Sequence, residues 1–420
     1  MLSRASLLPA TFALALALPV AASAQGAAGE QAEWAQNYDG ASRVRVQRSS
    51  TPILSPQALA ATEETVERYR DIVSRGGWGV LQAPASLRVG VRSPAVAALR
   101  QRLIVTGDLD PAAGSSEVYD SYVEAGVKRF QSRHGFNATG ALNAATIAAM
   151  NVPAETRLKQ LEINTARLRS YQNGLARRFV IVNLPAALVE TVEDGHVVTR
   201  HAAGVGKIDR QSPIMNAKIT QINFNPFWTA PASVVKKDLI PKMQKEPNYL
   251  AENKIRIYNK AGQEVAPTQI NWRSDEATHY MFKQDPGGDL NSMGFVRINI
   301  PNPHGVYMHD TPSKGIFGDD FRFVSSGCVR IQNVRDYITW LLKDTSGWDR
   351  EHIEQVFEAG SRTDATLAQP VAVYWTYITA WASPDGLVQF RDDIYNKDGL
   401  GNIPVASRVP TEPDELILNN

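Results

Sequence analysis

The spacing of apolar residues divides the chain into a helical first part and a strand-rich second part. Apolar side chains recur at helical intervals over residues 58–74, 96–103, 122–134, 143–151 and 158–171. From residue 179 the pattern becomes that of strands, at residues 179–184, 196–201 and 219–224. Asp194-Gly195, between the first two, is a strong hairpin turn. The pattern predicts an α+β multidomain protein whose second part is mostly β.

A further helical stretch at residues 232–245 and a hairpin at 255–262 interrupt the strands. We interpret residues from about 227 to 300 as an insertion that packs over the β-rich domain as a lid. The predicted organisation is a signal peptide (1–24), a flexible leader (25–55), a helical scaffold segment (56–85), a three-helix domain (86–152), a helical connector (153–177), the β-rich domain (178–356) and a C-terminal segment with a loose tail (357–420).

The first residues have the pattern of a secretory signal. Arg4 precedes an apolar stretch at residues 7–20, and Ala22-Ser23-Ala24 is a small-residue cleavage site. The apolar stretch is short for a membrane span, and no later segment approaches one. We therefore predict an exported chain with no transmembrane segment after cleavage.

Composition excludes some classes of function. A formal net charge of +1 gives no reason to expect nucleic acid as a partner. The seven histidines are scattered, and the chain has neither an H-E-x-x-H motif nor a second cysteine. The sequence therefore gives little support for a metal site.

The one cysteine of the chain, Cys328, lies in the segment S-S-G-C-V-R at residues 325–330. An exported protein with one cysteine cannot form an intramolecular disulfide, and a free thiol is liable to oxidation there. A buried, inert cysteine is the alternative. The small neighbours of Cys328 suit a nucleophile that a large substrate must reach, so we favour catalysis.

His309 is the candidate base for this thiol. Residues 306–309 alternate as a strand, which places Tyr307 and His309 on one face. The Gly-containing loop at residues 314–323 can fold His309 back towards Cys328, where the imidazole would lower the thiol pKa and take its proton. The carbonyl or side chain of Asp310, or another nearby carbonyl, is the candidate orienting group.

Five further residues are candidates around the pair. Gly327 lets backbone N–H groups approach an oxyanion, and Tyr307 can add a hydroxyl donor. A helix predicted at residues 334–342 places Cys328 at or just before a helix N-terminus. Arg330 either binds a substrate carboxylate or holds the loop. We also include Ser326 among the orienting groups and Trp228, at the start of the insertion, among the substrate-binding groups.

Two resemblances follow from these residues. Residues 127–131 (V-K-R-F-Q), Gly135-Phe136 and Thr139-Gly140 resemble the small three-helix peptidoglycan-binding domain found beside cell-wall enzymes. Residues 307–312 (Y-M-H-D-T-P) and 325–330 together resemble the YkuD-type L,D-transpeptidase family, especially its large periplasmic members with a capping insertion. The chain departs from many members in having Ser326 where they have His, and Asp310 where they have Gly or Ser.

The resemblance implies a sandwich-like catalytic domain, a periplasmic location and a two-step acyl transfer without cofactor. Cys328 would attack a tetrapeptide stem at diaminopimelate and release D-Ala. The side-chain amine of a second stem would then take the acyl group, forming a 3→3 crosslink. Such enzymes are also acylated by carbapenems. The alternatives are a carboxypeptidase or amidase that uses water, attachment of an outer-membrane protein as acceptor, and a non-catalytic murein-binding scaffold.

Overall fold

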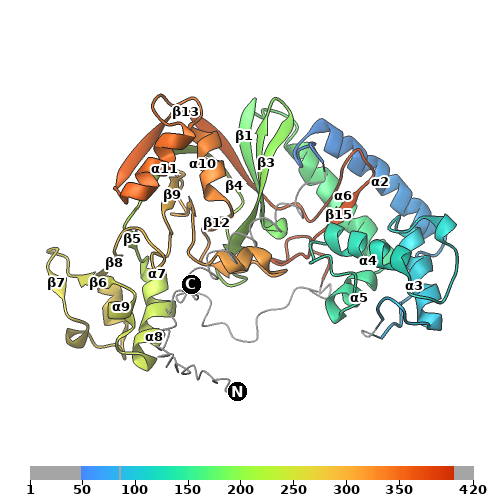
Figure 1. Ribbon diagram of the computed structural model, residues 1–420, viewed down its shortest axis with the longest axis horizontal. Coiled ribbons are helices and arrows are strands. Elements are labelled where there is room, and N and C mark those ends of the chain that lie inside the picture. The colour runs from blue at the N-terminus through green and yellow to red at the C-terminus, as the bar shows by residue number, and fades with distance from the viewer. Residues whose placement is uncertain (1–48, 85–86, 402–420) are drawn as a thin grey trace, which may run out of the picture.

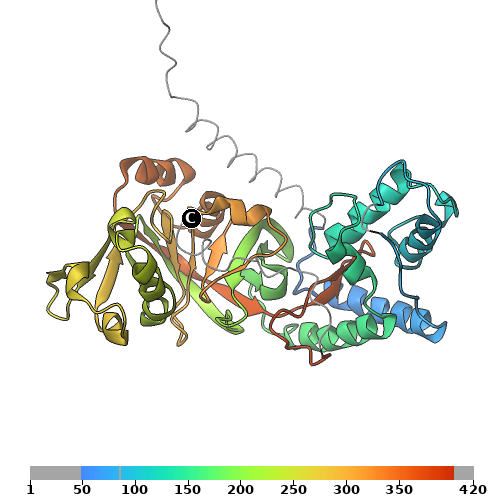
Figure 2. The same ribbon diagram turned by 90° about the horizontal axis from the view of Figure 1, so that it is seen from below.

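A computed structural model describes residues 49–84 and 87–401 of the 420-residue chain. The predicted signal peptide, most of the predicted leader and most of the predicted loose tail lie outside the described residues. A β-barrel occupies the middle of the molecule, with a helical lobe on one side and a small capping subdomain on the other (Figure 1, Figure 2).

The helical lobe confirms the helices expected from the apolar spacing. Ser55, Ser93, Asp120 and Asn143 each begin a helix by accepting a backbone N–H on the side-chain oxygen. The elements are α2 (Pro56–Ser74), α3 (Pro94–Val105), η1 (Pro111–Ala113), α4 (Ser121–Arg133), α5 (Ala144–Met150) and α6 (Ala154–Ser170). Helices α3, α4 and α5 enclose their own apolar core, which includes Leu99, Val127 and Met150.

The barrel is a nine-stranded sheet that closes on itself. Its strand order is β11-β3-β12-β10-β9-β4-β13-β1-β2, and β2 also pairs with β3. The strands are β1 (Arg178–Asn183), β2 (Leu188–Glu193), β3 (His196–Gly206), β4 (Met215–Phe224), β9 (Val296–Asn299), β10 (Met308–His309), β11 (Phe323–Ser325), β12 (Val329–Ile331) and β13 (Thr363–Thr376). The α+β multidomain class is confirmed, and the sheet of the mostly-β domain is barrel-like.

Two short turns of helix and two longer helices complete the barrel domain: η2 (Leu184–Ala186), η6 (Lys314–Gly318), α10 (Val334–Leu342) and α11 (Arg350–Ala359). Apolar side chains of α10 and α11, among them Ile338, Leu341 and Ile353, share one buried core with the barrel strands. Burial of this continuous apolar surface is the main stabilising contribution to the domain.

Two details of the β-rich part differ from the sequence analysis. The Asp194-Gly195 turn joins β3 to β2, a strand that the sequence analysis missed, and not to β1. The barrel continues past the predicted domain boundary at residue 356, because β13 lies between β4 and β1 in the sheet. The chain then returns to the helical lobe, where β14 (Ala380–Ala382) and β15 (Val388–Phe390) pack against α2 and α6.

The insertion forms a capping subdomain with its own core. A four-stranded sheet of order β5-β8-β6-β7 packs with short helices around Leu239, Tyr249 and Phe282. The elements are β5 (Trp228–Thr229), α7 (Ala232–Val234), the π-helical η3 (Val235–Leu239), α8 (Ile240–Lys245), α9 (Tyr249–Glu252), β6 (Ile255–Tyr258), β7 (Glu264–Val265), η4 (Pro267–Gln269), η5 (Asp275–His279) and β8 (Met281–Gln284). We call this subdomain the cap.

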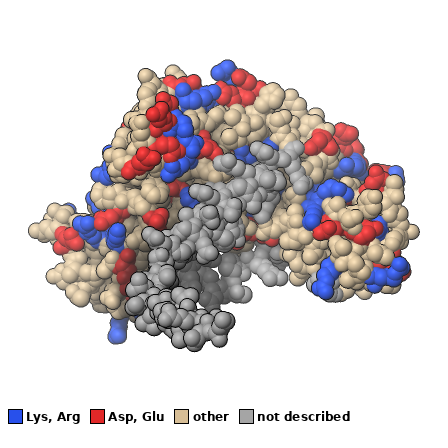
Figure 3. Space-filling model, viewed as in Figure 1, with Lys and Arg blue, Asp and Glu red and all other residues tan. Residues whose placement is uncertain are grey.

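The helical lobe also contacts the loop between β10 and β11. Asn137 donates its backbone N–H to Asp320 Oδ1 at 2.6 Å and its side-chain amide to the Gly318 carbonyl at 3.1 Å. Basic and acidic side chains are interspersed over the visible face of the molecule (Figure 3). Among the described residues, no helix is long and apolar enough to cross a membrane.

Candidate active site

A pocket of about 180 Å³ between the cap and the barrel contains both sequence-predicted catalytic side chains. His309 ends β10, and Cys328 lies in the short turn between β11 and β12. Because β10 and β12 are adjacent and pair His309 with Arg330, Cys328 just before β12 lies near His309. The walls are Trp228, Pro231, Ser233 and Val234 from the cap, with Ser292, His304, Gly305, Val306, Tyr307, Val324, Ser325, Ser326 and Arg330.

The ring of His309 is held by a backbone carbonyl. Its Nδ1 lies 2.5 Å from the carbonyl oxygen of Asp310, so Nδ1 carries the proton and Nε2 is left as the acceptor. The carboxylate of Asp310 is engaged elsewhere, because it pairs with Lys314 and accepts the Phe295 N–H. Of the orienting groups considered from the sequence, the Asp310 carbonyl is the one that contacts the ring.

The imidazole of His309 is neutral at physiological pH. Burial, together with the nearby Arg330 and Arg297 guanidinium groups, lowers the pKa of His309 to about 3, against the opposing hydrogen bond to Asp310. A neutral ring with a free Nε2 can accept a proton from a thiol. As an imidazolium, it would be a strong acid towards a leaving amine.

The thiol of Cys328 is protonated in the free protein. Its side chain is half-buried, and burial raises the pKa of Cys328 to about 11. Hydrogen bonds from Tyr307 and the charges of Arg297 and Arg330 oppose this rise. The expectation of a lowered thiol pKa is therefore wrong for the free protein, since loss of water outweighs the favourable charges.

The predicted helix N-terminus next to Cys328 is also wrong. Cys328 is followed by strand β12, and the helix α10 begins only at Val334, after Asn333. The apolar residues that follow the cysteine enter the barrel as a strand because β10 and β3 are available to pair with them. The helix itself has the predicted bounds.

The turn that carries Cys328 is fixed by two serines. The Ser325 hydroxyl donates to the Cys328 carbonyl at 2.5 Å and accepts the Gly327 N–H at 3.1 Å. Ser212, which the sequence analysis did not single out as a site residue, donates to the Gly327 carbonyl at 2.8 Å. Gly327 has a φ of +112°, which a side chain would strain.

These contacts determine which of the expected oxyanion donors are available. The Gly327 N–H is already bonded to Ser325, whereas the Cys328 N–H has no hydrogen-bond acceptor within the described residues. Tyr307 interacts through its hydroxyl with both Cys328 and Trp228, and its ring lies 5.6 Å from that of His309. The structure therefore brings Cys328, His309, Tyr307 and Trp228 together and leaves the Cys328 N–H as the available backbone donor.

Ser326 connects the Cys328 turn to the cap through Arg210. Its exposed hydroxyl accepts a hydrogen bond from Arg210 at 2.9 Å. Arg210 also forms a two-point ion pair with Asp238 of the π-helical η3, at 2.6 and 2.8 Å. π-Helical turns are frequent at functional sites. The sequence analysis missed Arg210 and Asp238, because their positions give no local signal of this contact.

Arg330 is buried in the pocket wall without a partner. Its Nε and Nη1 find no hydrogen-bond acceptor in the described part of the chain. Burial lowers the pKa of Arg330 to about 10, and the proximity of Cys328 partly offsets this. Of the two roles considered from the sequence, holding the loop has no contact to support it.

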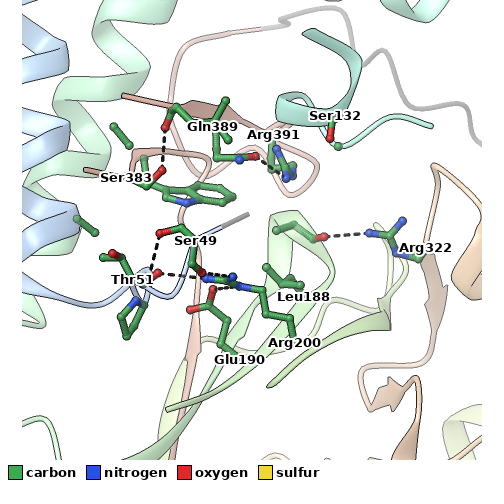
Figure 4. A pocket seen from close by; sticks show the side chains of 17 residues that line it. Ser49, Thr51, Ser132, Leu188, Glu190, Arg200, Arg322, Ser383, Gln389 and Arg391 are labelled. Atoms are coloured by element: carbon green, nitrogen blue, oxygen red, sulfur yellow. Dashed lines mark hydrogen bonds and ion pairs between the residues drawn. The ribbon is translucent and has the colours of Figure 1, made fainter. Parts of the chain in front are cut away.

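A second cavity lies where the helical lobe, the barrel and the C-terminal hairpin meet (Figure 4). Its charged side chains are bonded to protein atoms: Arg200 to Glu190 at 2.8 Å, Arg391 to Gln389 at 3.0 Å and Arg322 to the Ala186 carbonyl at 3.1 Å. This cavity is a junction between structural parts, and it contains neither Cys328 nor His309.

A capped β-barrel with a thiol beside a neutral imidazole is typical of an enzyme domain. In this chain a small helical domain adjoins it. Comparison with known families gives both parts their names. Residues 177–357 match the YkuD family, described as "L,D-transpeptidase catalytic domain", and residues 92–150 match a "Putative peptidoglycan binding domain". The chain therefore carries a YkuD L,D-transpeptidase catalytic domain together with a peptidoglycan-binding domain, as the two resemblances predicted.

One curated relative and two solved structures are similar to parts of this chain. A "Putative L,D-transpeptidase" of Haemophilus influenzae is 32% identical over 249 residues, which are 58% of this chain and 49% of that protein. The match thus spans about half the length of the relative. Solved L,D-transpeptidases of Xylanimonas cellulosilytica and Stackebrandtia nassauensis are 14% and 12% identical. They cover 70% of this chain in both cases, over 98% and 97% of their own, with TM-scores of 0.23 and 0.27.

Proposed function

We propose that this protein is a periplasmic L,D-transpeptidase that forms 3→3 peptidoglycan crosslinks through a thioester on Cys328. The observation that carries the proposal is that Cys328 and a neutral His309, whose Nδ1 is held by the Asp310 carbonyl, line the same capped pocket. The catalytic-domain match and the adjoining peptidoglycan-binding domain support the substrate class.

In the acylation step His309 Nε2 takes the thiol proton, and Sγ attacks the carbonyl carbon at the L-centre of diaminopimelate in a tetrapeptide stem. The oxyanion that forms accepts hydrogen bonds from the Cys328 N–H and the Tyr307 hydroxyl. The imidazolium then gives its proton to the departing amine of D-Ala, and the C–N bond breaks as the thioester forms. Gly327 allows the backbone conformation that presents the Cys328 N–H.

In the transfer step the side-chain amine of a second stem attacks the thioester. His309 accepts the amine proton and returns it to the departing sulfur, so the thiol is restored. Trp228 from the cap and Tyr307 from the barrel would line the path of the donor stem. Asp310 positions His309 through its carbonyl, and Ser326 would act only indirectly, through the contact of the Cys328 turn with the cap.

The test is mass spectrometry of products from the mature protein and a disaccharide-tetrapeptide, with Cys328→Ala as the control. We expect dimers joined through two diaminopimelate residues, and none with the variant. Tripeptide alone would show that water is the main acceptor. Absence of any product that depends on Cys328 would reject the enzyme and favour a murein-binding scaffold.

Two further readouts belong to the same proposal. Carbapenem acylation should add the mass of the drug at Cys328 and nowhere else, because the chain has one cysteine. Supplying an outer-membrane protein with an exposed lysine as acceptor, in place of a second stem, distinguishes protein attachment from crosslinking. The predicted export is tested by the N-terminal sequence of the protein recovered from the periplasm.

A further inference from the structure

Two arginines flank His309 on the strands to either side of it. In the register of the barrel, Arg297 of β9 and Arg330 of β12 are both direct partners of His309 of β10. Directly opposed residues on neighbouring strands project from the same face of a sheet. Arg297, His309 and Arg330 therefore form one row across three strands, and we call Arg297 and Arg330 the arginine pair.

The described residues supply no acid to the arginine pair. Neither arginine takes part in an ion pair, and Nε of Arg297 and both Nε and Nη1 of Arg330 are buried without a hydrogen-bond acceptor. The nearest carboxylate along the chain, that of Asp310, is occupied by Lys314 and the Phe295 N–H. Burying a cation without a counter-charge is costly, so the arrangement calls for a negative charge that appears during the reaction.

The sulfur of Cys328 is the site where such a charge can form next to both arginines. Cys328 and Arg330 are two positions apart and both line the pocket. Arg297 lies over the ring of Tyr307, with its guanidinium carbon 4.4 Å from the ring centre, and Tyr307 lines the pocket together with Cys328. Apart from these groups and His309, the titratable side chain in the pocket wall is His304 at the exposed rim.

We propose that the arginine pair, and not the imidazolium of His309, is the counter-charge that stabilises the Cys328 thiolate when it forms. The same two cations repel a proton on His309, so the ring works as a transient carrier. It passes the proton on to the leaving amine and does not remain in a standing thiolate–imidazolium pair. The inference rests on Cys328 as the nucleophile of the proposed function and assigns a new role to Arg297.

The directions in which these groups change one another's pKa agree with the geometry. Arg297 and Arg330 both lower the pKa of Cys328, and both lower the pKa of His309. Cys328 in turn raises the pKa of Arg330, because the thiolate form and the guanidinium stabilise each other. The main rival is that the arginine pair binds only a substrate carboxylate, which leaves the ionisation of the thiol unaffected.

The test is the rate of alkylation of Cys328 by iodoacetamide in the full-length protein, measured by mass spectrometry between pH 6 and pH 11. The chain has one cysteine, so the added mass reports this thiol alone. The variants are Arg297→Gln and Arg330→Gln, with Arg297→Lys and Arg330→Lys preserving the charge. Arg256→Gln in the cap, whose exposed guanidinium pairs with Asp285, is the matched control.

Each Gln variant should raise the apparent thiol pKa by about one unit and slow alkylation below that pKa about tenfold. The Lys variants and Arg256→Gln should stay near the parent protein. Unchanged alkylation profiles in both Gln variants, together with a raised KM for the tetrapeptide, would overturn the proposal in favour of carboxylate binding. Because alkylation needs no peptidoglycan substrate, this result is independent of whether the crosslinking activity is correct. If one Gln variant does not fold, the other tests the same claim.

Discussion

The peptidoglycan-binding domain and the active site each contain a buried arginine, Arg133 and Arg330. Of these two, Arg133 has an acidic partner within the described residues and Arg330 does not. Arg133 of the binding domain is 3% exposed and forms a two-point ion pair with the equally buried Asp108, at 2.7 Å for each hydrogen bond. Burial alone lowers the pKa of Arg133, but Asp108 raises it above its ordinary value. Arg330 is 6% exposed and has no acid partner, and burial lowers its pKa to about 10.

The difference separates two uses of a buried charge. In the binding domain the arginine joins α4 to the loop after α3, so its partner is part of the fold. In the active site the partner is absent until the chemistry creates it. The buried Arg330, which in the described part of the chain lacks both an acid and hydrogen-bond acceptors at Nε and Nη1, is therefore a candidate functional group, whereas the ion-paired Arg133 belongs to the fold.

The largest effect on stability should come from breaking the pair in the binding domain. Asp108→Ala leaves Arg133 buried with no counter-charge, and we expect the free energy of unfolding to fall by about 3–5 kcal/mol. Urea unfolding of the full chain measures this. Glu67→Ala removes an exposed ion pair with Arg70, which water and salt screen, and should lower the free energy of unfolding far less. Equal losses in the two variants would contradict the comparison.

Removal of the buried arginine from the active site should not lower the free energy of unfolding. Arg330→Met removes a cation that the fold does not neutralise, so the free energy of unfolding should stay the same or rise by about 1–3 kcal/mol. Formation of the acyl-enzyme should nevertheless slow by about 100-fold, because the thiolate loses a stabilising charge. Thermal unfolding and stopped-flow acylation give the two numbers. A large loss of stability would place Arg330 among the structural arginines.

The same contrast explains which parts of the site could be predicted from the sequence. Cys328 and His309 lie in short motifs whose residue types suggest their chemistry locally. Arg297 and Arg330 become a pair only through the register of three strands whose residues are 12 and 21 positions apart in the chain. Register depends on long-range pairing, and no local pattern in this chain reveals it.

The distinction between local and long-range signals also applies to the elements of the fold. Helices α2 to α6 could be predicted because their apolar spacing and capping residues are local. Strand β13 was missed because Pro370 interrupts its pattern, and proline is rare inside sheets. The pairing of β13 with β4 shifts its register between Thr366 and Val371, and this irregularity accommodates the proline. The pKa of Cys328 could not be foreseen either, because it depends on how deeply the cap and barrel bury the sulfur.

The smallest expected effect concerns acid stability, and it compares a buried histidine in each region. The pKa of His309 is lowered to about 3, and burial with nearby arginines lowers that of His134 in the binding domain well below its ordinary value. Between the lowered values and about pH 6.5, the unfolded chain binds more protons than the folded one. Each histidine therefore contributes stability that is complete above about pH 6.5 and is lost as the pH falls.

His309→Gln and His134→Gln should each reduce the slope of unfolding free energy against pH by up to about 1.4 kcal/mol per pH unit in this window. Urea unfolding at half-unit steps from pH 4 to pH 7 measures the slope, and the exposed His196→Gln is the control. The His309 variant should also lose acyl transfer, whereas the His134 variant should keep it. A slope that His309→Gln leaves unchanged would mean that the ring is already protonated in the folded protein. The arginine pair would then have failed to keep it neutral.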